Sequence, residues 1–141
     1  MKKLIYLFLT VSLATLFSMS SNAQAESKNV SWGQLNDFQN AFAAAYYPSQ
    51  AGNFEAIRSR ADEVSKLAMS LSGSVPKPFN SEEMTAAIKD LQKQTDAILA
   101  SVKNNAKDEA INPHMKDLNT ALEKVKSLCR TKLKEKGKDK E

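Results

Sequence analysis

The sequence predicts an all-α protein, an antiparallel up-down-up-down four-helix bundle. Apolar residues recur every three or four positions along four separate stretches, which keeps them on one face of a helix. Proline and glycine occur at the ends of these stretches or between them, apart from Gly33 in the first turn of the first stretch. No segment shows the alternation of a β-strand. Because most connections are short, consecutive helices are expected to run antiparallel.

Residues 1–25 have the parts of a secretory signal peptide. Lys2-Lys3 precedes an apolar run, and Ala23-Gln24-Ala25 has the small-x-small pattern of a cleavage site. A membrane anchor is the competing interpretation, but the run has about 14 residues and a spanning helix needs roughly 20. We therefore expect export to the periplasm or the exterior, cleavage before Glu26, and no membrane span in the mature chain.

Charge is concentrated at the C-terminus of the predicted mature chain. The whole sequence has 20 Lys+Arg and 16 Asp+Glu, and losing Lys2-Lys3 lowers the net charge from +4 to +2. Residues 130–141 contain six basic and three acidic residues, so the rest of the mature chain has 12 basic and 13 acidic residues. This nearly neutral body argues against a nucleic-acid partner. We divide the mature chain into one helical domain, 26–134, and a basic tail, 135–141.

The first helix is predicted to begin at Ser31 and to end before Pro48. Ser31 is placed as an N-cap, and Gln34 three residues later can complete a capping box. Val30 and Leu35 form the accompanying hydrophobic staple. Pro48 should stop the helix because its ring does not fit a helix interior. The apolar stripe comprises Leu35, Phe38, Phe42, Ala45 and Tyr46.

The second helix is predicted at about Phe54 to Ser72. Asn53 is placed to cap its start, and Gly73 stands where a helix end favours a left-handed residue. The segment 73–80 contains two prolines and should be the longest loop. The apolar stripe comprises Phe54, Ile57, Ala61, Val64, Ala68 and Leu71.

The third helix is predicted to start within residues 80–83 and to reach about Val102. Two glutamates occupy its first turn, where the helix dipole favours acidic groups, and Phe79 and Met84 can form a staple. Asn104-Asn105 should close it. The apolar stripe comprises Met84, Ala87, Ile88, Leu91, Thr95, Ile98 and Val102.

The fourth helix is predicted to begin at Pro113, which suits the first helical position after an Asn112 cap. Residues 108–111 could add one short turn before it. The helix should continue into the Lys-rich tail, which could bind an anionic surface or simply be a solvated end. Met115, Leu118, Leu122, Val125 and Cys129 form its apolar stripe, so Cys129 should point inward.

Candidates for chemistry are few. Cys129, the only cysteine, could be a cofactor ligand, a reactive thiol or a packed apolar residue. His114, the only histidine, could be a metal ligand or a surface or capping residue. At 1.5 Å per residue the two lie roughly 22 Å apart along the helix, so they cannot share one metal ion. No triad, phosphate loop or carboxylate pair is present, so no enzyme is expected.

The chain resembles the cytochrome c prime and soluble b-type cytochrome group, exported four-helix bundles that hold haem near the end of the last helix. The c-type members carry Cys-x-x-Cys-His there, and the matching stretch is Cys129-Arg130-Thr131-Lys132-Leu133. Lys132 stands in place of the second Cys and Leu133 in place of the proximal His. The b-type members use a Met of the first helix and a His of the fourth, and the first helix here has no Met.

A closer resemblance is to small exported relatives of these cytochromes, whose first helix reads FH, an apolar run, an aromatic residue, HP and a GN turn. The matching residues are Phe38-Gln39, Tyr46-Tyr47-Pro48 and Gly52-Asn53. Gln39 and Tyr47 replace the two histidines, and Asn119 and Glu123 stand where the relatives have His in the fourth helix.

Two functions follow from this resemblance. One is a non-catalytic binding or interaction module that kept the bundle and lost the haem ligands, with a protein partner or a small apolar ligand. The other is a haem- or metal-binding electron carrier with a different ligand set. Haem as a cofactor is implied only by the resemblance.

Overall fold

The computed structural model describes residues 31–138, and in that range it is all-helical and has no β-strand, as the sequence predicts. The helices are α1 (Gly33–Gln50), α2 (Glu55–Leu71), α3 (Glu82–Lys103) and α4 (Asp108–Lys138), with the short 3-10 turn η1 (Lys77–Phe79) between α2 and α3. The predicted signal peptide, 1–25, lies outside the described residues, as do Val30 and residues 139–141. Among the described helices none has the length and apolar character needed to cross a membrane.

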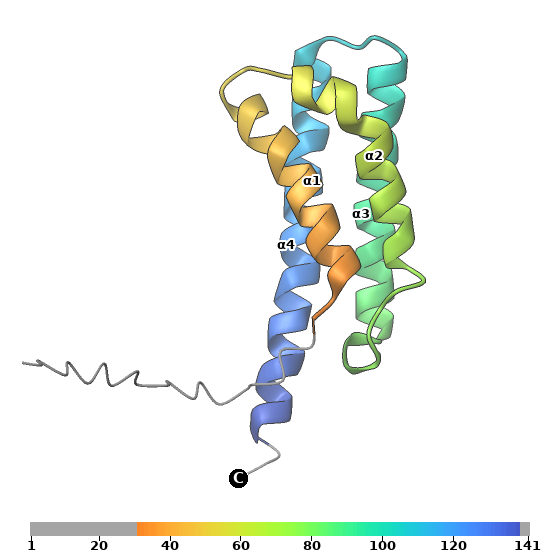
Figure 1. Ribbon diagram of the computed structural model, residues 1–141, viewed down its shortest axis with the longest axis vertical. Coiled ribbons are helices and arrows are strands. Elements are labelled where there is room, and N and C mark those ends of the chain that lie inside the picture. Colours follow the sequence, from red (N-terminus) through yellow and green to blue (C-terminus); the bar gives the residue numbers. More distant parts are fainter. Residues whose placement is uncertain (1–30, 139–141) are drawn as a thin grey trace, which may run out of the picture.

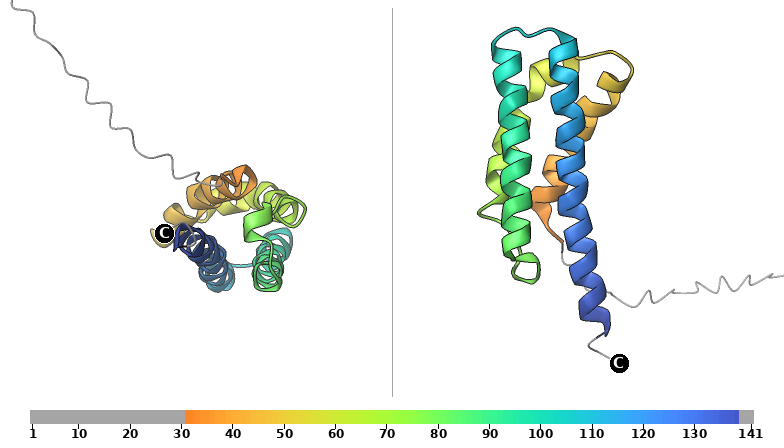
Figure 2. Two further views of the ribbon diagram at one scale, coloured as in Figure 1. Left: turned by 90° about the horizontal axis from the view of Figure 1, so that it is seen from below. Right: turned by 180° about the vertical axis from the view of Figure 1, so that it is seen from behind.

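The four helices lie side by side around a common interior (Figures 1 and 2). Close packing joins α1 to α2, α2 to α3 and α3 to α4, whereas α1 and α4 approach each other at few points. The turn η1 also touches α4. The C-terminal end of α4 extends past the other helices (Figure 2). The α1–α4 side is therefore the least closed side of the bundle.

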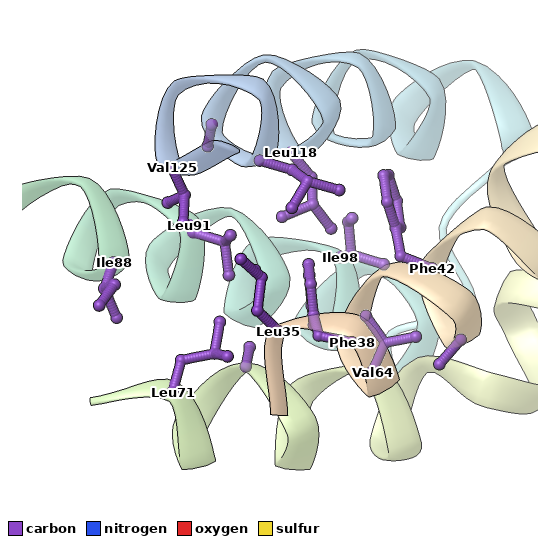
Figure 3. Packing of buried hydrophobic residues seen from close by; sticks show 14 of the residues in the cluster. Leu35, Phe38, Phe42, Val64, Leu71, Ile88, Leu91, Ile98, Leu118 and Val125 are labelled. Atoms are coloured by element: carbon purple, nitrogen blue, oxygen red, sulfur yellow. The ribbon is translucent and has the colours of Figure 1, made fainter. Parts of the chain in front are cut away.

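The predicted apolar stripes form one core. Side chains such as Phe38, Val64, Leu91 and Leu118, one from each helix, point toward one another (Figure 3). Nearly all stripe members are buried, and only Tyr46, Val102 and Cys129 lie partly exposed at its edge. The core also contains Trp32, Phe79 and Ile111, which the stripes did not include.

Two helix boundaries differ from the prediction because prolines lie inside helices. The helix α1 continues past Pro48 to Gln50, and α4 begins at Asp108 with Pro113 inside it. Each proline removes one hydrogen bond, to the carbonyl four residues earlier. Those carbonyls belong to Ala44 and Glu109, both of which are exposed, so water can hydrate them. This hydration limits the energetic cost of each proline. The helix can therefore continue past the proline and keep its core-facing residues buried.

The predicted start of α3 within residues 80–83 is confirmed, and the predicted Asn53 cap of α2 is confirmed in part. The Ser81 hydroxyl accepts a hydrogen bond from the Met84 N–H at 3.1 Å, as an N-cap does. The Asn53 side chain accepts from the Glu55 N–H at 3.0 Å, although the residue directly before α2 is Phe54.

Ser31 does not cap α1 and Gly73 does not adopt the left-handed conformation, so both of these predictions are wrong. The residue before α1 is Trp32, and no side chain caps that end. The buried Trp32 side chain anchors this end of α1 instead. It donates a hydrogen bond to Ser74 and stacks on Phe79, both in the segment between α2 and α3. Gly73 is not left-handed; the described residues with positive φ are Gly52, at 82°, and Asn105, at 51°, which ends α3. The three-residue turn η1 redirects the chain after α2.

Shortening a buried leucine should destabilise the fold strongly. Leu91 is 0% exposed, so Leu91→Ala removes packed methyl groups and leaves a cavity, at a cost of about 2 to 5 kcal/mol. Leu122→Ala should fall in the same range. The matched control is Met69→Ala on α2, where the side chain is 58% exposed and the change should stay within about 0.5 kcal/mol. Urea denaturation followed by circular dichroism measures all three, and equal losses for Leu91 and Met69 would contradict the assigned core.

A second stability prediction concerns Arg58, which joins α2 to the connection between α3 and α4. Its guanidinium donates to the Ala106 carbonyl at 2.7 Å and pairs with Asp108 at 2.5 Å. Arg58→Ala should lower the free energy of unfolding by about 1 kcal/mol, because both bonds are charge-assisted but partly exposed. The control is Arg60→Ala, whose exposed pair with Glu63 at 3.6 Å should contribute almost nothing. Equal effects in urea denaturation would show that the Arg58 contacts are not structural.

Candidate functional site

The α1–α4 side carries two adjoining hollows. The first, which we call the Cys129 hollow, has a volume of about 360 Å³. The second, the Tyr47 hollow, has a volume of about 180 Å³. Gln39 and Lys126 line both, so the two hollows adjoin, and together we call them the α1–α4 groove. The groove lies where α1 and α4 pack least closely, which is why side chains do not fill it.

The floor of the Cys129 hollow is apolar and partly aromatic. Trp32 and Phe79 stack with ring centroids 6.4 Å apart and planes 30° from parallel, and both are buried. The indole N–H of Trp32 donates to the Ser74 hydroxyl at 3.0 Å, so its polar group is satisfied within the protein. Leu35 of α1 and Leu133 of α4 complete the apolar lining. This floor can contact an apolar group without leaving a buried donor unpaired.

The segment between α2 and α3 brings Phe79 to this floor. Pro76 precedes η1 with φ −61° and ψ 142°, the extended geometry that proline favours. The Phe79 N–H then donates to the Pro76 carbonyl at 2.9 Å and closes a tight turn. The chain after α2 thus folds back under Trp32 and seals the end of the core.

The rim of the Cys129 hollow is basic. Lys126 and Arg130 lie one helical turn apart on α4 and both line the hollow. Glu123 forms a salt bridge with Lys126, and its other oxygen lies 3.8 Å from Arg130. One carboxylate against two cations leaves a net charge of +1 at this rim. Asn36 adds a neutral polar group on the α1 side.

Cys129 lies half-buried in the wall of the hollow that bears its name. Burial raises the pKa of its thiol above the ordinary value, and the positive charge of Arg130 opposes this shift only in part. The thiol therefore stays protonated at neutral pH, which makes it a weak nucleophile and a weak ligand.

His114 lies near the other end of α4 and is partly buried. Fifteen positions separate it from Cys129, roughly 22 Å along a helix, so the structure keeps the two candidates apart. Among residues 31–138 no group of three or more His, Cys, Asp or Glu side chains could hold a metal ion. The role of His114 as a metal ligand stays a prediction.

The Tyr47 hollow brings together four residues that the sequence related only by resemblance. Gln39 and Tyr47 of α1 face Asn119 and Glu123 of α4 across it. Two amides, a phenol and a carboxylate thus meet in one hollow. Tyr47 itself is 72% exposed and stacks edge-on against Tyr46, with centroids 6.0 Å apart. These groups are suited to hydrogen bonding.

Sequence reasoning named Trp32 among the aromatic residues that could line an apolar pocket between helices, but it did not identify Phe79, Lys126 and Arg130 as site residues. Trp32 and Phe79 lie in different segments, and only folding joins them. Lys126 and Arg130 could have been found, because they are four residues apart and flank Cys129 on the same helix.

Comparison with known proteins gives no match: no protein-family model, no curated protein and no solved structure matches the chain. The function is therefore inferred from the sequence and from the geometry of the α1–α4 groove.

The pKa of Cys129 leads to a prediction about its reactivity. Alkylation by iodoacetamide needs the thiolate, so the rate should rise only at a pH above that of a free cysteine. Arg130→Gln removes the charge that lowers the pKa, so its rate profile should shift to still higher pH. Lys124→Gln, an exposed change on the same helix, is the control and should leave the profile unchanged. Mass spectrometry of timed samples measures the rates, and a shift toward lower pH in Arg130→Gln would contradict this electrostatic assignment.

Proposed function

We propose that this protein is an exported, non-catalytic binding module that holds its ligand or partner in the α1–α4 groove. The observation that carries the proposal is the groove itself, an apolar floor with a cationic rim on the one loosely closed side of the bundle. Ligand sites combine a mostly apolar surface with a few placed polar groups, and the groove has both.

We further infer that the four helices form an antiparallel up-down-up-down bundle. Each helix packs closely against its neighbour in the sequence, and the connections 51–54 and 104–107 are short. Short connections favour antiparallel neighbours. In this topology α1 and α4 are the first and last helices and complete the ring only by meeting each other. That position favours a groove between them.

Export is proposed from residues 1–25, with their basic start, apolar run and small-x-small site. The compartment would then be the periplasm or the exterior, where oxidising conditions prevail. The chain has only one cysteine, so no internal disulfide would form there. A bundle held by packing alone is compatible with either location.

A binding role is favoured over catalysis by the chemistry of the groove. Its thiol has a raised pKa, so Cys129 is a poor nucleophile at neutral pH. Its carboxylate, Glu123, forms salt bridges with Lys126 and Arg130, so its oxygens already have partners. Its amides, Gln39 and Asn119, cannot act as an acid or a base.

The groove also does not fit the haem of the cytochromes that the sequence resembles. Its lining offers one sulfur, that of Cys129, and no imidazole or thioether. Axial ligands to haem iron are usually His, Met or a Cys thiolate, and in some proteins Tyr. The second candidate function, a haem- or metal-binding electron carrier, therefore depends on Cys129 or on a tyrosine of the Tyr47 hollow.

A haem titration tests this choice. Purified mature protein mixed with haemin should give no saturable, stoichiometric Soret band, because Leu133 stands in the place of a proximal His and α1 offers no Met or His. The same titration is run on Cys129→Ser and on His114→Ala. A stoichiometric band that Cys129→Ser abolishes would overturn the proposal and make Cys129 the iron ligand. A band lost only in His114→Ala would place the site at the other end of α4.

A further inference from the structure

We propose that the Cys129 hollow binds a small amphiphilic carboxylate, with the acid group on the rim of Lys126 and Arg130 and an acyl chain over the floor of Trp32 and Phe79. The inference rests on the proposed function, since it names the class of ligand for the same groove. It follows from three properties of the hollow: its apolar floor, its charge and its size.

The apolar floor of the hollow favours an apolar group on the ligand. Trp32 and Phe79 are core residues that are 4% and 2% exposed, and the indole N–H is already bonded to Ser74. Leu133 is only partly buried and lines the other side. An acyl chain over this floor shields the partly exposed Leu133 and Cys129 from water and breaks no hydrogen bond. Because the two rings are already covered, the favourable transfer comes from these two residues and from the apolar surface of the chain itself.

The net positive charge of the rim favours an anionic group on the ligand. Arg130 presents the planar fork that pairs with a carboxylate through two parallel hydrogen bonds, and Lys126 stands one turn away as a second cation. Glu123 neutralises only one of these two charges. Residues 130–138 extend the same positive field, because they contain five basic residues and one acidic residue.

The size of the hollow favours a small ligand. Its volume of about 360 Å³ is near the lower end of the usual range for ligand pockets, about 300 to 1,000 Å³. The Tyr47 hollow adjoins it at Gln39 and Lys126. A single medium-length acyl chain with one carboxylate satisfies both the volume and the charge.

A tryptophan in the floor of the hollow allows ligand binding to be followed by fluorescence. Trp32 is the only tryptophan, so the intrinsic tryptophan fluorescence of the protein comes from the floor of the hollow. We would titrate mature protein with decanoate below its micelle concentration and follow this fluorescence, with calorimetry as a second measurement. Decanol and decylammonium have the same chain length and serve as neutral and cationic probes. Decanoate should bind saturably at one site, at least about tenfold more tightly than either probe.

Variants of the rim sharpen the test. Lys126→Gln and Arg130→Gln should each weaken decanoate binding about three- to tenfold, because both side chains are partly exposed. Glu123→Gln removes the competing carboxylate and should tighten binding, an effect that a misfolded variant cannot imitate. Lys124→Gln, an exposed lysine outside the hollow, is the matched control and should bind as the unaltered protein does.

Several outcomes would overturn the inference. Equal affinity for decanoate, decanol and decylammonium would show a site without charge selectivity. Affinity unchanged in Arg130→Gln and Glu123→Gln would place the anion elsewhere. A concentration-dependent dimer in sedimentation velocity that Leu133→Gln abolishes would assign the hollow to a second copy of the chain. Absence of decanoate binding together with absence of haem binding would reject this inference alone, whereas stoichiometric haem binding would reject the proposed function.

Discussion

A single apolar core is the constraint on which the rest of this structure depends, because the chain has one cysteine and no internal disulfide can reinforce it. All four helices must therefore bury their apolar faces against one another. The middle helices, α2 and α3, each pack on two partners, while α1 and α4 pack on one partner each and hardly on each other. The groove lies at the place where the core has the fewest side chains to close it.

The loop after α2 closes one end of the loosely packed α1–α4 side. Phe79 and Trp32 come from segments without long helices, yet they stack together and cover the end of the core beneath α1 and α4. The hydrogen bond from the Trp32 indole to Ser74 ties the start of α1 to that loop. The same pair of rings that protects the core from water also forms the floor of the Cys129 hollow. The stability of the fold and the proposed binding thus rely on the same two aromatic side chains.

The sequence predicted the core well because helical periodicity is a direct consequence of burial on one face. Residues such as Phe38, Leu91 and Leu118 are buried as their spacing requires. Local rules failed at Pro48 and Pro113, since such rules count the lost hydrogen bond but not the exposure of the carbonyl that loses it. The rule for Gly73 failed because the chain leaves α2 without a left-handed residue.

The candidate site was predictable only in part, for a different physical reason. Cys129 was found because it lies on an apolar stripe, and that is a property of one helix. The floor of the hollow depends on contacts between segments 42 or more residues apart, as the Trp32–Ser74 bond shows, and a pattern within one helix carries no information about such contacts.

The geometry of the groove brings four polar residues from two helices together. Gln39, Tyr47, Asn119 and Glu123 are separated in the sequence but line one hollow, next to the rim of Lys126. Their amide, phenol and carboxylate groups form hydrogen bonds and ion pairs and do not supply the nitrogen ligands that histidines give to a transition metal. A groove lined in this way can select a ligand by its shape, charge and hydrogen-bonding groups. The apolar core that shapes this groove lies behind these four positions, so the shape of the groove does not depend on which polar side chains line it.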